Sequence, residues 1–243
     1  MNRFLVVILV LCLSKAGYAQ YGKFTLTFAT GPNIPIGAFA NHNMNSNVGA
    51  GYAKSGLNFN GSFGFRLSRY AGIGVMVIST SNPINSQSFA ADFSAQQGIP
   101  FKATIGNWKA TGGFFGLFYS IPVKRFFFDI RLYRGFLACI SPEYKLQSYD
   151  HQISVTQKSA TSAISYAYDF GTSVKYVVGE SKRLFLMGNF DFVLTRPNFN
   201  NVEIITSYAP NTPPSYGSMS FSQPYSNITI SFGVGVILGK MIY

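Results

Sequence analysis

Charged residues are scarce in this chain of 243 residues: they make up 11% of it, against about 25% in ordinary soluble domains. This scarcity excludes a charge-rich coiled coil. Two cysteines exclude a disulfide-dense scaffold. Beyond the first 19 residues, no apolar run approaches the ~20 residues that a membrane-spanning helix needs. Among the charged residues, the acidic ones are fewer: the chain has 8 Asp and Glu and 19 Lys and Arg, which gives a formal charge of +11.

Aromatic residues and glycine are abundant instead. Aromatics make up 16% of the chain, with 24 Phe and 24 Gly. A disordered basic tail is therefore excluded, and the length fits one domain of ordinary size.

The first segment has the order of a secretory signal peptide. Arg3 precedes an apolar run over residues 4–13, and Gly17 and Ala19 supply small residues at a cleavage site before Gln20. A short membrane anchor is the alternative, but no stop-transfer pattern follows. We therefore expect a signal peptide over residues 1–19. Its removal leaves Cys139 as the single cysteine, and an inert buried thiol is favoured over a reactive one.

The rest of the chain alternates with a period of two residues. In residues 57–68, one face carries Leu57, Phe59, Phe63, Phe65 and Leu67, while the other carries Asn, Ser, Gly and Arg. Such alternation is typical of β-strands. The pattern predicts eight strands, over residues 23–30, 57–68, 71–80, 108–121, 125–140, 163–176, 183–195 and 228–238.

The connections between these strands alternate in length. Short turns are expected around residues 69–70, 122–124 and 179–181, and long loops over residues 31–56, 81–107, 141–162 and 196–226. Short turns on one rim and long loops on the other are typical of an outer-membrane β-barrel. A sheet that spans a bilayer must close, because every backbone polar group needs a partner in hydrocarbon. A soluble β-sandwich or lipocalin-like barrel is the alternative, although its exposed face should carry more Lys, Glu and Thr.

These features resemble the small eight-stranded outer-membrane barrels of the OmpA/OmpX type. The resemblance rests on the leader ending at Ala19, the alternating residues 24–28 and the closing residues 230–236. It implies an all-β, eight-stranded antiparallel transmembrane barrel over residues 20–243, without a peptidoglycan-binding domain. It further implies the outer membrane of a Gram-negative bacterium, insertion by the barrel-assembly machinery, a monomer, and no catalytic residues. Tyr243 departs from the family's closing pattern, since simple alternation aligns it with Gly233 and Gly235.

Several charged residues fall on the polar face, which would point into the lumen. An acid/base pair of Asp169 and Asp191 is one interpretation, and a salt-bridge network that fills a narrow barrel is the other, favoured one, because buried charges are normally paired. The predicted lumen charge network comprises Arg66, Asp129, Arg131, Asp169, Lys175 and Asp191.

Six further basic residues gather at the expected turns, where anionic lipid headgroups would meet them: Arg69, Lys124, Arg125, Lys182, Arg183 and Lys240. This placement argues against a nucleic-acid binder, which displays basic residues along one face. We expect aromatic girdles at both interfaces, with Tyr21, Tyr70, Tyr119, Phe126 and Tyr176 near the turns. Trp108, Tyr133 and Tyr166 are expected at the opposite interface.

Catalytic and cofactor motifs are weak. His42 and His151 fall in long loops, with no partnered nucleophile and no metal-ligand spacing. Residues 144–147 and 153–156 alternate on either side of His151 and predict a hairpin with this histidine at its tip. Gly72 and Gly74 lie inside a strand, so that they form no phosphate-binding loop. We therefore expect no enzyme, metal or cofactor. A lipid-modifying enzyme and a narrow passive channel remain as alternatives.

The long loops are the expected functional surface. Tyr208 and Tyr216 flank a segment rich in Pro, Asn and Ser, a composition suited to adaptable binding. A weakly ordered loop under no binding constraint is the alternative. The prediction is a structural or surface-interaction protein whose ligand the sequence does not name.

Overall fold

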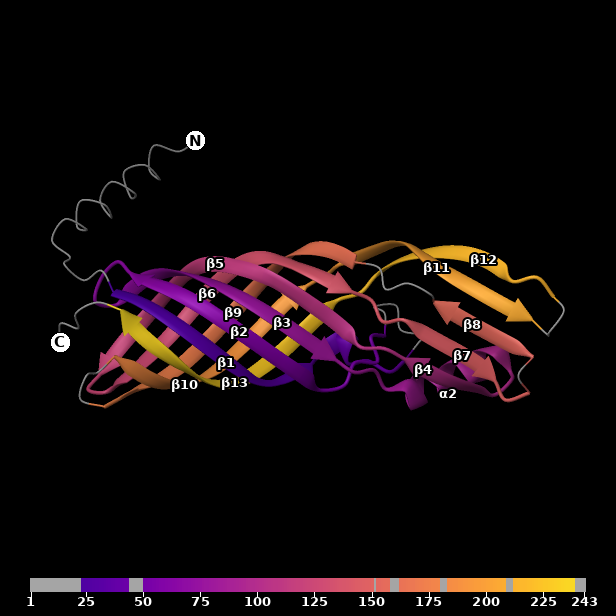
Figure 1. Cartoon of the computed structure of the whole chain (residues 1–243), viewed down its shortest axis with the longest axis horizontal. Helices are drawn as coiled ribbons and strands as arrows, with labels where there is room; N and C mark the ends of the chain where they lie inside the picture. The colour runs from indigo at the N-terminus through magenta and orange to yellow at the C-terminus, as the bar shows by residue number, and fades with distance from the viewer. Residues whose placement is uncertain are drawn as a thin grey trace, which may run out of the picture.

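The computed structural model describes residues 23–43, 50–150, 152–157, 162–179, 183–208 and 212–238. Two bodies follow one another along its long axis, a barrel at one end and a smaller sheet at the other (Figure 1). The barrel consists of eight antiparallel strands, which are β1 (Lys23–Pro35), β2 (Gly56–Arg66), β3 (Ala71–Asn82), β5 (Trp108–Val123), β6 (Phe126–Ile140), β9 (Ser162–Val178), β10 (Leu184–Thr195) and β13 (Tyr225–Leu238).

The barrel is closed by the pairing of its first strand with its last. β1 pairs with β2 on one side and with β13 on the other, and Leu26 lies opposite Val236 in the second ladder. Every strand thus has two neighbours, and the sheet has no open edge. The predicted eight-stranded antiparallel barrel is confirmed, with strand boundaries close to those expected.

Alternate residues of each strand face the inside and the outside of the barrel. Along β3, Gly72, Met76 and Thr80 are buried, whereas Ile73 and Val77 are exposed. The same alternation runs through the other barrel strands, and the exposed set consists mainly of Phe, Leu, Ile, Val and Tyr. The period-two pattern of the sequence therefore corresponds to an apolar outer wall and a mixed interior.

Short turns join the strands at the end where β1 begins and β13 ends (Figure 1). Between β5 and β6 the turn is Lys124 and Arg125 alone, because Val123 already pairs with Phe126. The predicted turn over residues 122–124 is thus displaced toward the C-terminus. Lys124 has a positive φ of 55°, a conformation that such a tight turn can impose on a non-glycine residue.

The long connections at the opposite end contain a second folded unit, which we call the cap. It comprises a helix and a five-stranded sheet in the order β12-β11-β8-β7-β4. Its elements are α2 (Ser86–Gln97), β4 (Phe101–Ile105), β7 (Tyr144–Ser148), β8 (Ile153–Gln157), β11 (Asn198–Tyr208) and β12 (Ser215–Ser222), and a short helix η1 (Gly37–Phe39) lies between β1 and β2.

The sequence predicted only one hairpin of the cap. Residues 144–147 and 153–156 alternate, and β7 and β8 pair there as expected. Helix α2 was not predicted, although Asn85 caps its start by accepting a hydrogen bond from the Ser88 amide, and Gly98 ends it with a φ of 71°. No helix among the described residues is long and apolar enough to cross a membrane.

Candidate functional site

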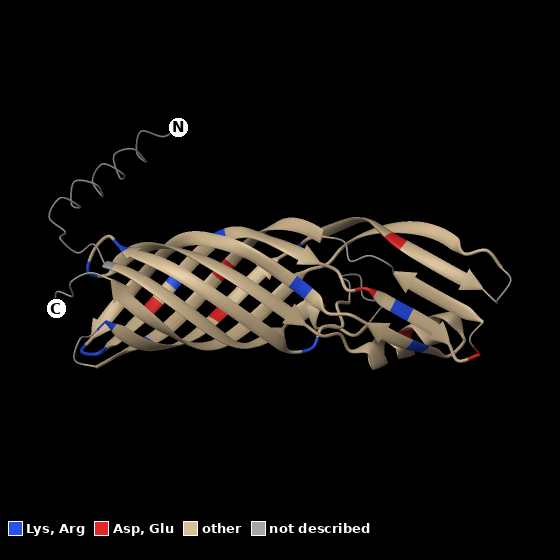
Figure 2. Ribbon diagram, in the orientation of Figure 1, with Lys and Arg blue, Asp and Glu red and all other residues tan. Residues whose placement is uncertain are grey.

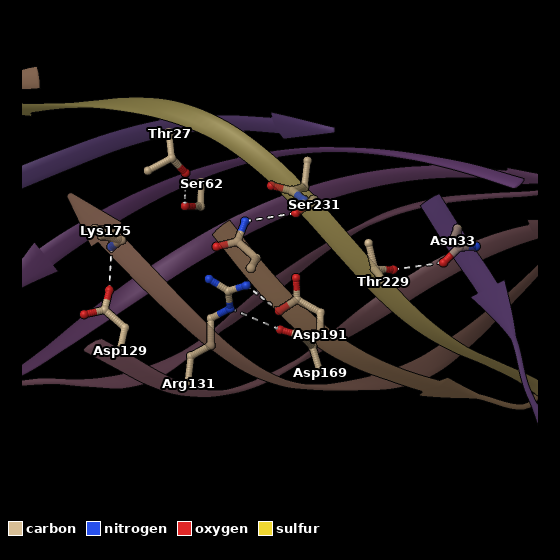
Figure 3. A network of polar contacts seen from close by, with 12 residues as sticks. Thr27, Asn33, Ser62, Asp129, Arg131, Asp169, Lys175, Asp191, Thr229 and Ser231 are labelled. Atoms are coloured by element: carbon tan, nitrogen blue, oxygen red, sulfur yellow. Dashed lines mark hydrogen bonds and ion pairs between the residues drawn. The ribbon is translucent and has the colours of Figure 1, made fainter. Parts of the chain in front are cut away.

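The barrel interior is filled by side chains in three layers. Toward the turns, an apolar cluster consists of Phe127, Val177, Phe185, Met187 and Ile237. Toward the cap, a larger cluster contains Phe39, Trp108, Phe114, Leu137 and Tyr225, together with Cys139, which is a buried free thiol. A polar and charged layer lies between them, since Asn189 and Asp191 of β10 stand between Met187 of the first cluster and Val193 of the second. Figure 3 shows the contacts of this layer.

Five of the six predicted lumen charges meet in this middle layer as two ion-pair groups. The Arg131 side chain contacts Asp191, and its Nε lies 3.9 Å from Asp169 Oδ2. Lys175 Nζ lies 2.5 Å from Asp129 Oδ2. Asp169 and Asp191, the suggested acid/base pair, therefore share one guanidinium, as expected of buried acidic groups in an ion-pair network.

Arg66, the sixth, lies closer to the turns. Its guanidinium donates to the Ser120 hydroxyl over 2.9 Å and lies 4.5 Å from the centre of the Phe127 ring. A polar contact and a cation–π contact thus hold this cation at the edge of the apolar cluster near the turns.

Uncharged hydrogen bonds complete the polar layer. Thr27 and Ser62 join β1 to β2 through hydroxyls 2.5 Å apart, and the Asn189 amide donates to Ser231 over 3.0 Å. Nearer the cap, the Asn33 amide donates to Asn82. The Thr229 hydroxyl donates to Asn33 (Figure 3). These contacts cross-link strands from the inside and occupy the lumen.

The outer wall carries the predicted girdle aromatics only in part. Tyr70, Tyr119, Phe126, Tyr176 and Tyr166 are exposed on the wall, and Tyr21 lies outside the described residues. Trp108 and Tyr133 are both buried inside the barrel, so that their placement at an interface was wrong. The indole of Trp108 instead donates to the Gly51 carbonyl over 2.9 Å, beneath the cap.

Charge is distributed unevenly between the wall and the rim. Arg134 is an exposed cation of the barrel wall, and its guanidinium lies 5.1 Å from the centre of the Tyr166 ring. Basic ribbon segments appear at the turns, whereas acidic segments of the barrel lie away from them (Figure 2). Arg69, Lys124, Arg125 and Arg183 belong to this basic rim, and Lys182 and Lys240 lie outside the described residues.

The two tyrosines predicted as a loop surface lie on one hairpin but on opposite faces. Tyr208 is 49% exposed at the end of β11, and Tyr216 is 67% exposed near the start of β12. Tyr216 lies opposite Ile205, and Tyr208 is three residues further along β11. Because side chains of a strand alternate between faces, the two rings do not form one surface.

Sequence reasoning missed an apolar cavity of about 470 Å³ between the barrel mouth and the cap. Its walls include aromatic rings from the segment between η1 and β2, from helix α2 and from the strands. Two signals could have indicated it: the helical spacing of Phe89 and Phe93, and the concentration of aromatics in the loops. The rings that line it are Tyr52, Phe89, Phe93, Trp108, Tyr144 and Phe221.

The histidines offer no catalytic arrangement in the described part of the chain. The His42 ring is stacked on Tyr52 with centroids 5.8 Å apart, and His151 lies outside the described residues. Within the described ranges, no group of three or more His, Cys, Asp or Glu side chains is placed to hold a metal ion.

Neither a family model nor a curated protein matches the sequence. Among solved structures, this chain is similar to the outer membrane protein OprG from Pseudomonas aeruginosa, with 8% identity, a TM-score of 0.45, and 90% of this chain and 97% of that chain covered. It is similar to a major outer membrane protein from Thermus thermophilus, with 10% identity, a TM-score of 0.48, and 90% and 100% covered. It is also similar to the outer membrane protease OmpT from Escherichia coli, with 6% identity, a TM-score of 0.48, and 90% and 97% covered. At such identities no ligand or activity carries over from those proteins to this chain.

Proposed function

We propose that this chain is a non-enzymatic integral outer-membrane protein that acts at the cell surface through its cap. The observation that carries the proposal is the closed barrel with large apolar side chains all around its outer wall. Leu117 is 64% exposed and Phe232 is 68% exposed, and they belong to strands on different sides of the barrel. Soluble monomers rarely expose apolar surface on this scale, whereas hydrocarbon stabilises it.

The cap then lies on the outer side of the membrane. Both ends of the barrel chain, at β1 and β13, lie with the short turns, and the cap lies at the other end (Figure 1). Short turns on the periplasmic side and longer extracellular connections are the usual layout of such barrels. The basic rim of Arg69, Lys124 and Arg125 would meet anionic phospholipid headgroups of the inner leaflet.

The filled interior argues against the alternative of a passive channel. Two apolar clusters enclose the ion pairs, and Arg131 and Asp191 contact each other across the lumen side of the sheet. An eight-stranded barrel has an interior just wide enough for its own side chains. We expect planar bilayers with the folded protein to show no stepwise conductance above that of the empty bilayer, and regular steps would favour the channel.

The third candidate, a lipid-modifying enzyme, would need a base held beside a nucleophile. His42 stacks on an aromatic ring, which favours a packing role. The variants His42→Ala and His151→Ala are expected to leave the lipid composition of the outer membrane unchanged. Altered lipid A acylation or phospholipid content in either variant would support the enzyme instead.

The proposal includes a cleaved leader over residues 1–19, which lies outside the described residues, insertion by the barrel-assembly machinery, and a monomer. The membrane location and the closed barrel are tested by fractionating cells and running the outer-membrane fraction on an SDS gel with and without boiling. A closed barrel has no edge strand for detergent to open, so it should migrate faster until heated. Recovery of the protein in the soluble periplasm, with no shift, would overturn the membrane location.

A further inference from the structure

The apolar cavity lies where the barrel mouth meets the cap. It is bordered by residues 50–52, by one face of α2, by Trp108 at the start of β5, and by Tyr144 and Phe221 of the cap sheet. Its volume of about 470 Å³ falls within the range of pockets that hold drug-sized ligands.

The ring walls are held in place by contacts with one another. Tyr52 and Phe89 meet edge to face, with centroids 5.2 Å apart and an angle of 87°, and Phe89 lies 5.5 Å from Tyr144. Beneath them, Trp108 packs against Phe199, and the hydrogen bond to Gly51 also fixes its indole. Because these rings are packed before any ligand arrives, binding would order few side chains.

Charge is absent from the lining, as far as the described residues show. Its polar members are Gln96, Gln157, Ser222, Gln223 and the two tyrosines. The Gln157 amide donates to the Pro142 carbonyl over 2.6 Å, and the Gln223 amide donates to the Pro224 carbonyl over 3.2 Å. Burial raises the pKa of Tyr144, so that its phenol stays neutral. Directly behind the lining, the Asp92 carboxylate accepts a hydrogen bond from the Tyr52 hydroxyl over 2.5 Å. An anionic ligand would therefore lose its hydration here without gaining a counter-ion.

The cavity is partly open to solvent, so that a ligand can reach its rings. A flat apolar molecule that displaced water from this lining would bury apolar area and add dispersion contacts with the rings. Aromatic faces in several orientations suit a planar ligand, which can stack on one ring and meet another edge-on.

We propose that this cavity is a binding site for an uncharged, planar, largely apolar small molecule. The inference goes beyond the surface role proposed above and does not depend on the compartment that the cap faces. It can therefore succeed or fail independently of the membrane location.

Trp108 allows a direct test, because it is the only tryptophan of the chain and lines the cavity. The full-length folded protein, in a fixed concentration of detergent, is titrated with coumarin as a neutral planar probe and with coumarin-3-carboxylate as its charged counterpart. We expect coumarin to quench Trp108 fluorescence with saturation, and the carboxylate to bind roughly tenfold more weakly or not at all.

Ala50→Phe would fill the cavity from one wall, and Phe93→Ala would remove one of its rings. Ser218→Phe is the matched control, since Ser218 is exposed on β12 and does not line the cavity. We expect the control to bind like the unmodified protein, and both cavity variants to bind about tenfold or more weakly. A mobility shift on heating establishes that each variant is folded.

Three results would overturn the proposal. The first is quenching that never saturates, as partition into detergent would produce. The second is equal affinity in the unmodified protein and in both folded cavity variants. The third is tighter binding of the carboxylate than of coumarin.

Discussion

Arg131 of β6 and Asp191 of β10 contact each other across the full width of β9, the strand between them. Both lie directly opposite Gly171, which is the one residue of β9 at that level. A Cβ atom at this position would overlap both the Asp191 carboxylate and the Arg131 side chain. The absence of a side chain at Gly171 is therefore what permits this ion pair to form.

Gly171→Ala should consequently destabilise the barrel. The methyl group would displace either the guanidinium or the carboxylate, and a buried charge without its partner is costly. Gly113→Ala is the matched control, since its Cβ would face the outside with the nearest atom 3.9 Å away. We expect the temperature of the SDS mobility shift to fall for Gly171→Ala and to stay unchanged for Gly113→Ala. Equal temperatures would contradict this account of the ion pair.

Arg131→Met should be more damaging than the glycine change, because it leaves Asp169 and Asp191 facing each other without a cation. Removal of one partner from a buried ion pair typically costs about 3–5 kcal/mol. Arg134→Met makes the same substitution three residues along β6, on the exposed outer wall. Urea unfolding in lipid vesicles should separate the two variants by several kcal/mol. A similar loss in both would mean that Arg131 is not stabilised by its ion pairs.

The barrel could be predicted from the sequence because its strands differ between their two faces. In β2 the outer positions are almost all Leu or Phe and the inner ones are Asn, Ser, Gly and Arg. The two-residue period of the strand and the face that points outward are therefore both evident from the sequence. The same alternation placed the lumen charges on the inner face of their strands. Their pairing partners depend on strand register, which the sequence does not state.

Trp108 was misplaced because β5 lacks such a contrast. Its inner positions include Trp108, Phe114 and Phe118, and its outer positions include Phe115 and Leu117. When both faces are apolar, alternation cannot show which one is inside. Most of the cap was missed for a related reason, since three of its five strands have only five residues and β8 is half-exposed on both faces.

Because Trp108 is buried, we expect its fluorescence to differ from that of a girdle tryptophan at the lipid interface. Trp108 is 4% exposed and its indole is hydrogen-bonded to Gly51 inside the barrel, so that lipid does not reach it. Its fluorescence should be blue-shifted and nearly insensitive to brominated lipids. The double variant Trp108→Phe with Tyr119→Trp moves the probe to the exposed wall and should be strongly quenched by brominated lipid. Strong lipid quenching of Trp108 itself would show that it faces the bilayer.

The variant Leu117→Arg distinguishes a barrel wall that faces lipid from one that faces water. Leu117 lies at mid-length of β5 and is 64% exposed, and Tyr216 in the cap is 67% exposed. In water, an Arg at either site should change stability by less than about 0.5 kcal/mol. In a bilayer, an Arg at mid-depth on the outer wall costs about 2–4 kcal/mol, whereas the cap would lie outside the hydrocarbon. We therefore expect Leu117→Arg to lower the yield of the heat-modifiable form in vesicles and Tyr216→Arg to leave it unchanged. If the two variants fold equally well in lipid, the apolar wall does not face hydrocarbon.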